Sequence, residues 1–362
     1  MAKSTIIIAC GGTGGHIYPA LAVADMIKEQ RPDMEIKFVG RTSGMERELV
    51  KENGYEMETI NISGFKRGEW LSNLQLPFFL AGAIIKAGII IRKYSPCVAI
   101  GTGGFVSCPV VLSASFMRIP TIILEQNTIP GLTTRFLSHF ARILILAYEE
   151  SADLVTKRIE KTVLGNPIRK LHFVDKNKLR REHGLSEDSQ VVLVLGGSQG
   201  ARNLNNSVAA MLDNFLKIPG RDLIWQTGSL DYSRIKELAG ENSHVRVFKY
   251  IKSIYDCYSM ADLVIARAGA TTLAEITAFG LPAVLFPYPH STDNHQGKNA
   301  AALEEKGAAV VLQDNTMELG GTIESIIADK VRLARMARNS KSLSKPDAAK
   351  NIVKLINERF FK

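Results

Sequence analysis

Cysteine is scarce in this sequence, and its few copies are scattered. Cys10, Cys97, Cys108 and Cys257 form no Cys-x-x-Cys pair and show no spacing typical of a metal site. Disulfide frameworks and structural zinc sites both need closely patterned cysteines, so neither is expected here. The pattern favours a reducing cytosol. We also expect no metal and no cofactor.

Hydrophobic runs long enough to cross a membrane are also missing. One stretch, Leu76–Ile91, is strongly apolar, but Pro77 and Lys86 interrupt it. It falls short of the roughly 20 residues that a membrane-spanning helix needs. The apolar run Ile6–Cys10 is too short for the hydrophobic region of a signal peptide. We expect neither a transmembrane helix nor a signal peptide.

Several common nucleotide-binding motifs are absent. There is no P-loop pattern Gly-x-x-x-x-Gly-Lys-Ser/Thr, and no Asp-x-Asp of the kind that metal-dependent, single-domain sugar-nucleotide transferases usually carry. An NAD site needs an acidic residue where the second strand ends. That segment here reads Phe38-Val39-Gly40-Arg41. Arg41 could face a 2′-phosphate, which leaves NADP less disfavoured than NAD. These absences favour a metal-independent transferase with two domains.

The charge balance, by contrast, is basic, with 45 Lys and Arg against 36 Asp and Glu and a formal net charge of +9. Such an excess suits phosphate-bearing substrates, an anionic lipid surface or nucleic acid. Moderately basic proteins without any of these partners are also common, so charge alone does not choose among them.

Short apolar runs alternate with amphipathic stretches over nearly the whole chain, which is typical of βα units on a parallel sheet. The length of 362 residues is sufficient for two domains with separate cores. In the first half we expect strands near Ser4–Cys10, Ile36–Gly40, Met57–Ile62, Val98–Thr102, Thr121–Glu125 and Ile143–Ala147, and a long helix from about Trp70 to Lys93. The pattern then restarts, with strands expected at Gln190–Leu195, Leu223–Thr227, Val245–Tyr250, Leu263–Ala266, Ala283–Phe286 and Ala309–Leu312.

This pattern predicts two doubly wound, Rossmann-like α/β domains that face each other across a cleft. The halves meet around Leu164-Gly165-Asn166-Pro167. We assign residues 1–165 to the first domain and residues 166–345 to the second. A C-terminal helix, about Asp347–Arg359, follows Pro346 and could cross back, so that residues 346–362 join the first domain.

Three glycine clusters follow expected strands: Gly11–His16, Gly101–Gly104 and Gly196–Arg202. Glycine lets the backbone approach a ligand closely, and the N-terminus of a following helix offers unpaired N–H groups to phosphate. A single cluster could be only a tight turn. Two clusters that open the first βα unit of successive domains, with a third between them, favour phosphate binding.

Further motifs make a more specific match, in the same order along nearly the whole chain. They are GGTGGHIYPALAVA (Gly11–Ala24), GTGGFVSCP (Gly101–Pro109), LEQN with PGLT (Leu124–Thr133), GNPIR (Gly165–Arg169), GGSQGARNLN (Gly196–Asn205), ARAGATTLAEITAFGLPAVLFPYP (Ala266–Pro289) and DNHQGKNA (Asp293–Ala300). Together they resemble the MurG family of bacterial N-acetylglucosaminyltransferases, which convert lipid I into lipid II in peptidoglycan synthesis. The resemblance implies the GT-B architecture of paired Rossmann-like domains. It places UDP-N-acetylglucosamine mainly on the C-terminal domain and the lipid-linked acceptor on the N-terminal one.

The resemblance also implies roles for residues that would bind the nucleotide. Glu275 would accept hydrogen bonds from the ribose hydroxyls, although glutamates on helices are usually only solvated. Thr271 and Thr272, in the turn before that glutamate, would donate to the diphosphate at the start of a helix. Ser198 and the neighbouring amides would assist, and Arg169 would neutralise phosphate charge unless it is only a surface residue of the linker.

The remaining implied contacts concern the base, the sugar and the first glycine turn. Ile251 would recognise uracil through its backbone, and Asn127 and Gln296 would contact the sugar. Thr13, Gly14 and Gly15 would contact the substrate as well. The sequence departs from the family in two places, because His295 stands where glutamine is frequent and Leu124 stands where histidine is frequent. Sugar selection through position 295 is therefore open, and neither position is given a catalytic role.

Forming a β-linkage from an α-linked donor requires inversion, with in-line attack by an acceptor hydroxyl and a general base on its side. His16 is the best candidate for that base, since it ends the first glycine turn and imidazole titrates near neutral pH. It could instead bind local backbone or the acceptor diphosphate. Glu125 could also accept the proton, or it could only anchor Asn127 and a loop. Without a metal, helix N-termini and Arg169 must stabilise the leaving group.

The stretch Leu76–Ile91 has two interpretations. Such a strongly apolar stretch usually forms a helix that is buried in the protein core. However, basic residues flank or interrupt it, and apolar insertion backed by basic residues is how proteins rest on anionic bilayers. These basic residues are Lys66, Arg67, Lys86, Arg92 and Lys93. Because the implied acceptor is a polyprenyl lipid, we expect partial exposure and peripheral binding to the cytoplasmic face of the cell membrane. Other cell-wall synthesis proteins could be partners, and no nucleic acid is expected.

Three alternatives remain open. A lipid glycosyltransferase of the same fold could glycosylate diacylglycerol, although the full set of motifs argues against it. A UDP-N-acetylglucosamine 2-epimerase shares the fold but would not need an apolar, basic face. A sensor could bind the nucleotide sugar without transferring it.

Overall fold

The computed structural model describes residues 4–62, 76–172, 174–197, 200–314 and 316–361. The chain divides into two compact units: Met1–Lys170 together with Pro346–Lys362, and Leu171–Lys345. The first unit thus extends to Lys170. Arg169 and Lys170 belong to it because their side chains donate hydrogen bonds to Asn53 and Glu29 of the same unit.

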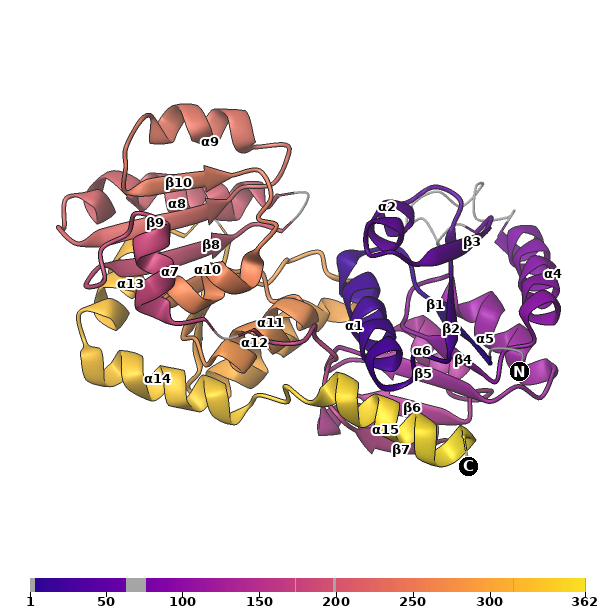
Figure 1. Cartoon of the computed structure of the whole chain (residues 1–362). Coiled ribbons are helices and arrows are strands. Elements are labelled where there is room, and N and C mark those ends of the chain that lie inside the picture. Colours follow the sequence, from indigo (N-terminus) through magenta and orange to yellow (C-terminus); the bar gives the residue numbers. More distant parts are fainter. Residues whose placement is uncertain (1–3, 63–75, 173, 198–199, 315, 362) are drawn as a thin grey trace. The chain divides into compact units, whose positions relative to one another are not determined.

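The first unit is built on a seven-stranded, all-parallel sheet with the order β3-β2-β1-β4-β5-β6-β7 (Figure 1). Its strands are β1 (Thr5–Ala9), β2 (Glu35–Arg41), β3 (Glu56–Ile60), β4 (Val98–Gly101), β5 (Thr121–Glu125), β6 (Ile143–Leu146) and β7 (Glu160–Val163). The predicted segments of this half are confirmed as strands, whereas β7 was not predicted. It is a short edge strand in which three of the four residues are only half-buried and the first is exposed, so it lacks a clear apolar pattern.

The helices of the first unit connect these strands. They are α1 (Gly14–Gln30), α2 (Met45–Glu52), α4 (Leu76–Tyr94), α5 (Ser107–Phe116), α6 (Leu132–Leu137), the 3₁₀ helix η1 (Glu149–Leu154) and α15 (Ala348–Phe360). The predicted helix from Trp70 to Lys93 is found as α4 from Leu76 onward, and its first part lies outside the described residues. The C-terminal helix α15 packs on α1, because Ile352, Val353 and Ile356 share one apolar cluster with Ile17 and Leu21.

The second unit contains a six-stranded, all-parallel sheet with the order β10-β9-β8-β11-β12-β13. Its strands are β8 (Gln190–Leu195), β9 (Arg221–Gln226), β10 (Val245–Phe248), β11 (Leu263–Ala266), β12 (Ala283–Leu285) and β13 (Ala309–Val311). The strand order changes direction between β8 and β11, because β9 and β10 lie on one side of β8 and β11 to β13 lie on the other. Doubly wound sheets bind ligands at such a switch point, at the carboxyl ends of the strands. The prediction of two Rossmann-like α/β domains is confirmed.

The helices of the second unit cover both faces of its sheet. They are α7 (Lys176–Glu182), α8 (Arg202–Leu216), α9 (Tyr232–Ala239), α10 (Ile254–Met260), α11 (Ala270–Phe279), η2 (Thr292–Asn294), α12 (His295–Glu305), α13 (Leu319–Ile327) and α14 (Lys330–Ser342). Two apolar clusters flank the sheet, one centred on Trp225 and Phe286 and the other on Tyr258 and Leu273.

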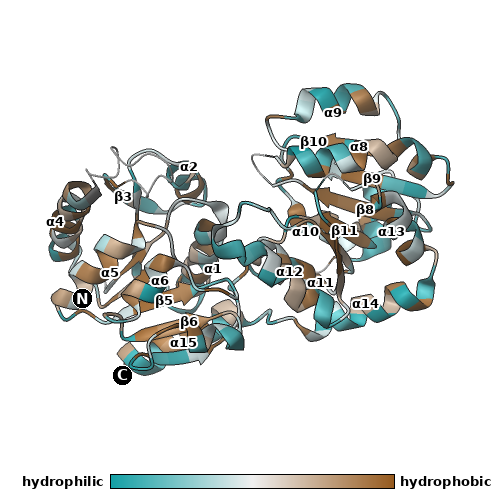
Figure 2. Cartoon of the chain, turned by 180° about the vertical axis from the view of Figure 1, so that it is seen from behind, coloured by the Kyte–Doolittle hydropathy of each residue, from teal (hydrophilic) through white to brown (hydrophobic). Residues whose placement is uncertain are grey.

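The central strands are largely apolar because helices cover both faces of each sheet. Every residue of β1 and β6 is buried, and Figure 2 shows the strands of both sheets coloured mainly as hydrophobic. In contrast, α14 carries a largely hydrophilic surface in the same view. In the described part of the chain, every helix is too short or too polar to cross a bilayer.

Candidate functional site

In the first unit, the glycine turns after β1 and β4 hold His16. The Nδ1 atom of His16 lies 3.1 Å from the carbonyl oxygen of Thr102, and the Thr102 hydroxyl donates to the carbonyl oxygen of His16 over 2.8 Å. Gly103 and Gly104 adopt φ of +100° and +74°, and a Cβ atom on either would lie within 2.5 Å of His16 Nδ1 or the Gly11 carbonyl. Only glycine therefore allows this close approach.

The hydrogen bond to Thr102 fixes the tautomer of the neutral His16 ring. A carbonyl oxygen can only accept, so Nδ1 must carry the hydrogen, and the basic lone pair of the neutral ring then lies on Nε2. The same Thr102 oxygen accepts from the Nε2 amide of Gln126 at 2.9 Å. Thr102 thus joins His16 to the segment after β5. Sequence analysis missed Thr102 and Gln126, although both lie inside motifs that it quoted.

The carboxylate of Glu125 is buried, and both of its oxygens hold donors. Oε1 accepts from the backbone N–H and the side-chain amide of Asn127, at 3.0 and 3.1 Å, and Oε2 accepts from the N–H of Gly131 at 3.0 Å. Glu125 thus orders the loop of residues 127–131. Of the two sequence-based interpretations, this geometry favours the anchoring role over the role of proton acceptor.

Together, these residues occupy the carboxyl edge of the first sheet. β1, β4 and β5 are neighbouring parallel strands, so the turns that follow them meet at one edge. Thr13, Gly14 and Gly15 open α1 at this edge, and Glu125 and Asn127 follow β5. The structure therefore brings together the predicted site residues of the first unit, with the exception of Arg169.

Arg169 lies against the first unit at a different place. Its Nη2 donates to the side-chain oxygen of Asn53 at 3.1 Å, and its guanidinium group stacks over the ring of Tyr18 with 5.5 Å to the centroid. Tyr18 belongs to α1 and Asn53 follows α2. The predicted contact of Arg169 with the donor diphosphate stays a prediction.

In the second unit, Glu275 lies on α11 and is half-buried. Its Oε2 accepts a hydrogen bond from the hydroxyl of Tyr258 at 3.1 Å. Tyr258 is one of the largest fully buried side chains. Its burial and the nearby carboxylate raise the pKa of Tyr258 well above its usual range, so the hydroxyl stays protonated and donates. Tyr258 could not be recognised from the sequence, because it lies outside the quoted motifs.

The start of α11 has the features of an anion site. The helix begins at Ala270, directly after Gly269, with no side-chain cap and no acidic residue in its first turn. The positive dipole end of the helix therefore favours a negatively charged group at this position. Thr271 and Thr272 lie in this first turn, as predicted for residues that bind diphosphate.

Ile251 and Gln296 each contact a partner within the protein. The N–H of Ile251 donates to Oε1 of Gln226 at 2.9 Å, so a backbone contact with a base would use its carbonyl group. Oε1 of Gln296 accepts from the N–H of Tyr288 at 2.9 Å. His295 Nδ1 donates to the carbonyl oxygen of Thr292 at 2.7 Å. The predicted residue Ser198 lies outside the described residues.

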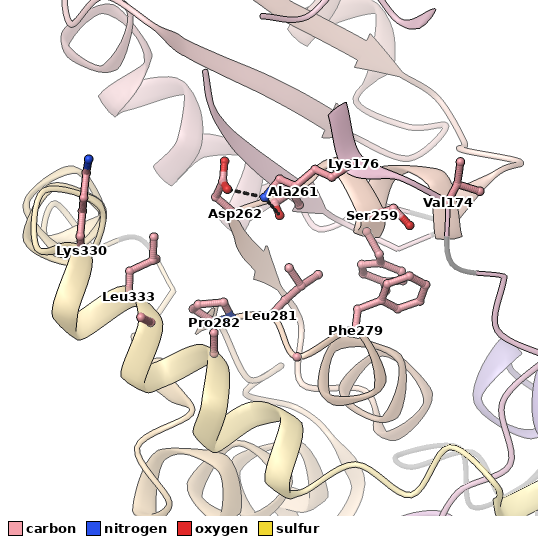
Figure 3. A pocket seen from close by; sticks show the side chains of 14 residues that line it. Val174, Lys176, Ser259, Ala261, Asp262, Phe279, Leu281, Pro282, Lys330 and Leu333 are labelled. Atoms are coloured by element: carbon pink, nitrogen blue, oxygen red, sulfur yellow. Dashed lines mark hydrogen bonds and ion pairs between the residues drawn. The ribbon is translucent and has the colours of Figure 1, made fainter. Parts of the chain in front are cut away.

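A pocket of about 400 Å³ in the second unit is lined by residues of α7, α10 and α14 and by residues that precede β11 and β12 (Figure 3). Its lining includes the ion pair between Lys176 Nζ and Asp262 Oδ1, which are 2.5 Å apart, and apolar side chains such as Leu281 and Leu333. None of the predicted site residues lines it, but Tyr258 does. Among the described residues, no group of three or more His, Cys, Asp or Glu is arranged to hold a metal ion.

Comparison with known proteins gives consistent matches. Residues 6–145 match the glycosyltransferase family 28 N-terminal domain, and residues 191–352 match the family 28 C-terminal domain. A relative from Chlorobium luteolum is 41% identical over 352 residues, covering 95% of this chain and 96% of the relative. One from Listeria monocytogenes is 40% identical over 362 residues, covering 97% and 98%. Both are named UDP-N-acetylglucosamine–N-acetylmuramyl-(pentapeptide) pyrophosphoryl-undecaprenol N-acetylglucosamine transferase.

Solved structures agree on the fold. MurG from Acinetobacter baumannii superposes with a TM-score of 0.77 at 27% identity, covering 98% of this chain and 99% of that one. A UDP-GlcNAc 2-epimerase from Neisseria meningitidis, bound to UDP-GlcNAc, gives 0.69 at 13% identity, covering 98% and 100%. At that identity the second match shows the shared fold alone.

Proposed function

The chain belongs to glycosyltransferase family 28, and we propose that it transfers N-acetylglucosamine from UDP-N-acetylglucosamine to undecaprenyl-pyrophosphoryl-N-acetylmuramyl-(pentapeptide). This is the step that converts lipid I into lipid II in peptidoglycan synthesis. The observation that carries the proposal is the identity of 41% over 95% of the chain to a relative named for this activity. The confirmed pair of Rossmann-like domains supports it.

In this proposal the second unit binds the donor. The uncapped N-terminus of α11, with Thr271 and Thr272, takes the diphosphate, and Glu275 accepts hydrogen bonds from the ribose hydroxyls. A carboxylate can accept up to about four hydrogen bonds, so a single carboxylate can hold more than one hydroxyl. Ile251 contacts uracil through its backbone, and Gln296 contacts the sugar together with Asn127.

The first unit supplies the acceptor site and the general base. The 4-hydroxyl oxygen of N-acetylmuramic acid bonds to C1 of the donor sugar while the bond from C1 to the diphosphate oxygen breaks. The hydroxyl proton passes to His16 Nε2, and the electron pair of the broken bond leaves with UDP. The tautomer fixed by Thr102 supports this role, because it leaves the lone pair on Nε2. The dipole of α11, assisted by Arg169, stabilises the charge on the leaving group.

We also propose that α4 binds the cytoplasmic face of the cell membrane peripherally. One side of α4 is buried through Ala83 and Ala87, but the other side exposes large apolar residues. Phe78, Ile85 and Ile89 are 81%, 66% and 57% exposed. Apolar side chains this exposed support insertion into the interfacial region of a bilayer.

Neighbouring elements extend the same kind of surface. Phe116 on α5, which packs against α4, is exposed, as are Leu132 and Phe136 on α6. Lys86 and Arg92 of α4 are exposed as well and would attract anionic lipids. Lys66 and Arg67, which also entered the prediction, lie outside the described residues.

The activity is tested by mixing labelled UDP-N-acetylglucosamine with purified protein and a lipid I analogue. We expect label to move to the acceptor and UDP to be released only when the acceptor is present. Transfer to diacylglycerol in place of lipid I would refute the proposed acceptor. Conversion of the free donor to its 2-epimer would identify an epimerase, and binding without any turnover would identify a sensor.

The membrane proposal is tested by co-sedimentation with vesicles of anionic or of neutral phospholipid. We expect the protein to sediment with anionic vesicles, and a triple variant Phe78→Ser, Ile85→Ser and Ile89→Ser to lose most of this binding. Leu230→Ser is the matched control, since Leu230 is 89% exposed on the second unit. Equal sedimentation of the triple variant and the control would refute a role for α4.

A further inference from the structure

The peptide group between Thr102 and Gly103 lies against the His16 ring in the first unit. Its carbonyl oxygen is 3.1 Å from His16 Nδ1. It directly precedes Gly103, whose φ is +100°. Glycine adopts either sign of φ, so a peptide group next to it can turn over at little steric cost. Other contacts are therefore needed to hold the orientation that the structure shows.

Two buried side chains hold this peptide group, one at each end. The Nε2 amide of Gln126 donates to the Thr102 oxygen at 2.9 Å, and the Gly103 N–H donates to Oγ of Ser107 at 3.0 Å. The Ser107 hydroxyl itself donates to the Gly103 carbonyl oxygen at 2.7 Å, so its lone pairs are left to accept from the N–H. Gln126 follows β5 and Ser107 begins α5, so the two contacts come from separate elements.

The direction of this peptide group decides which nitrogen of a neutral His16 ring carries the hydrogen. With the Thr102 oxygen toward the ring, Nδ1 must donate and the lone pair lies on Nε2. If the peptide group turned over, the Gly103 N–H would face the ring, Nδ1 would have to accept, and the hydrogen would move to Nε2. A ring in that state could no longer take a proton at Nε2.

We propose that Gln126 and Ser107 are positioning residues that hold the Thr102–Gly103 peptide group and thereby keep His16 in the tautomer that can act as general base. The inference rests on the proposed function, because it presupposes that His16 Nε2 accepts the proton of the acceptor hydroxyl. Neither residue touches the substrate in this role. Each acts through the peptide group on the ring, so its loss lowers turnover and leaves the binding of the nucleotide, which the proposal assigns to the second unit, intact.

The first readout is the tautomer itself, observed by NMR on protein with isotope-labelled histidine at about pH 8.5, about two units above the usual pKa of imidazole. A long-range proton–nitrogen correlation spectrum separates protonated from unprotonated ring nitrogens, and the signals of His16 are those that His16→Gln removes. We expect the hydrogen of the wild-type ring on Nδ1. In Gln126→Met and in Ser107→Ala, the hydrogen should be distributed over both nitrogens.

The second readout is turnover with the lipid I analogue. One lost hydrogen bond should lower kcat by about two- to tenfold in each variant, while the KM for UDP-N-acetylglucosamine stays within about twofold. In the double variant, kcat should fall by less than the product of the two single falls, because either loss already frees the same peptide group.

Lys161→Met and Ser138→Ala are the matched controls. The side chain of Lys161 donates to the carbonyl oxygen of Ala152 at 2.6 Å, and the hydroxyl of the buried Ser138 donates to that of Arg135 at 2.6 Å. Both bonds lie in the first unit. Each control therefore loses a hydrogen bond from a side chain to a backbone carbonyl, as the two test variants do, and should keep the wild-type tautomer and kcat.

The outcomes separate this inference from the proposed function. A wild-type ring with its hydrogen on Nε2, or a tautomer that is unchanged in Gln126→Met and Ser107→Ala, would overturn the inference even if turnover fell. A changed tautomer with unchanged kcat would support the hold on the ring and refute His16 as the base. If the wild-type protein transferred no sugar to lipid I, the proposed function would fail, and the tautomer alone would decide the inference.

Discussion

Removing the hydroxyl of Tyr258 tests whether this residue positions Glu275 for the ribose. The substitution Tyr258→Phe deletes one donor, 3.1 Å from Glu275 Oε2, and leaves the ring that packs against Phe279 at 5.3 Å. A hydrogen bond to a charged group contributes about 1.5–3 kcal/mol, but Glu275 is half-buried and water can replace part of it. We therefore expect the free energy of UDP binding to become less favourable by about 1.4 kcal/mol, which corresponds to a roughly tenfold rise in Kd.

The assay is equilibrium binding of UDP and of 2′-deoxy-UDP. If Glu275 receives the ribose hydroxyls, the wild-type protein prefers UDP. Tyr258→Phe should reduce this preference several-fold, because the carboxylate loses its fixed orientation, while turnover at saturating donor changes less than the KM for the donor. A general destabilisation of the fold would instead weaken the binding of UDP and of 2′-deoxy-UDP by the same factor. This result would refute the positioning role.

Tyr55→Phe provides the matched control for this experiment. The hydroxyl of Tyr55 donates to Asp25 at 2.7 Å, so the variant also loses a part-buried tyrosine–carboxylate hydrogen bond, but in the first unit. Each variant should lower the free energy of unfolding by about 1 kcal/mol. Only Tyr258→Phe should change the ratio of UDP to 2′-deoxy-UDP affinity.

Three further substitutions test the first unit. His16→Ala should reduce turnover by about 10²- to 10⁴-fold while UDP binding is retained; an unchanged rate would remove His16 as the base. Glu125→Gln should destabilise the loop of residues 127–131 and lower the melting temperature, whereas a stable variant without turnover would restore Glu125 as the proton acceptor. Burial alone would raise the pKa of Glu46, but hydrogen bonds from Arg41 outweigh it and lower that pKa. Its stabilisation is therefore present above the unfolded pKa of about 4.3 and is lost as pH falls through the folded value. Denaturant titrations should show Glu46→Gln less stable than wild type near neutral pH, with a gap that closes below about pH 4; a gap independent of pH would contradict this.

The sheets could be predicted from the sequence because their strands are buried on both faces. β1 and β8 read as unbroken apolar runs for that reason, and each was predicted within one or two residues. β7 was missed because Glu160 and Lys161 make up half of it and the strand lies at the edge of the sheet. An edge strand needs no continuous apolar run, so its sequence carries little signal.

The site was predictable where chemistry depends on the backbone and not where it depends on packing. The glycine turns could be recognised because close approach requires the absence of a side chain, as at Gly103 beside His16. The bonds Tyr258–Glu275 and Ile251–Gln226 join residues on different elements. Their formation depends on how helices and strands pack, which no local motif encodes.

The predicted ligand-binding residues differ in the hydrogen bonds that they already make within the protein. Several of these groups already have partners within the protein, and what each can still do depends on how many donors or acceptors remain. Glu275 already accepts from Tyr258, and Arg169 already donates to Asn53. The N–H of Ile251 is a single donor, and Gln226 holds it. The proposed contact between Ile251 and the base therefore uses the Ile251 carbonyl group and not that N–H.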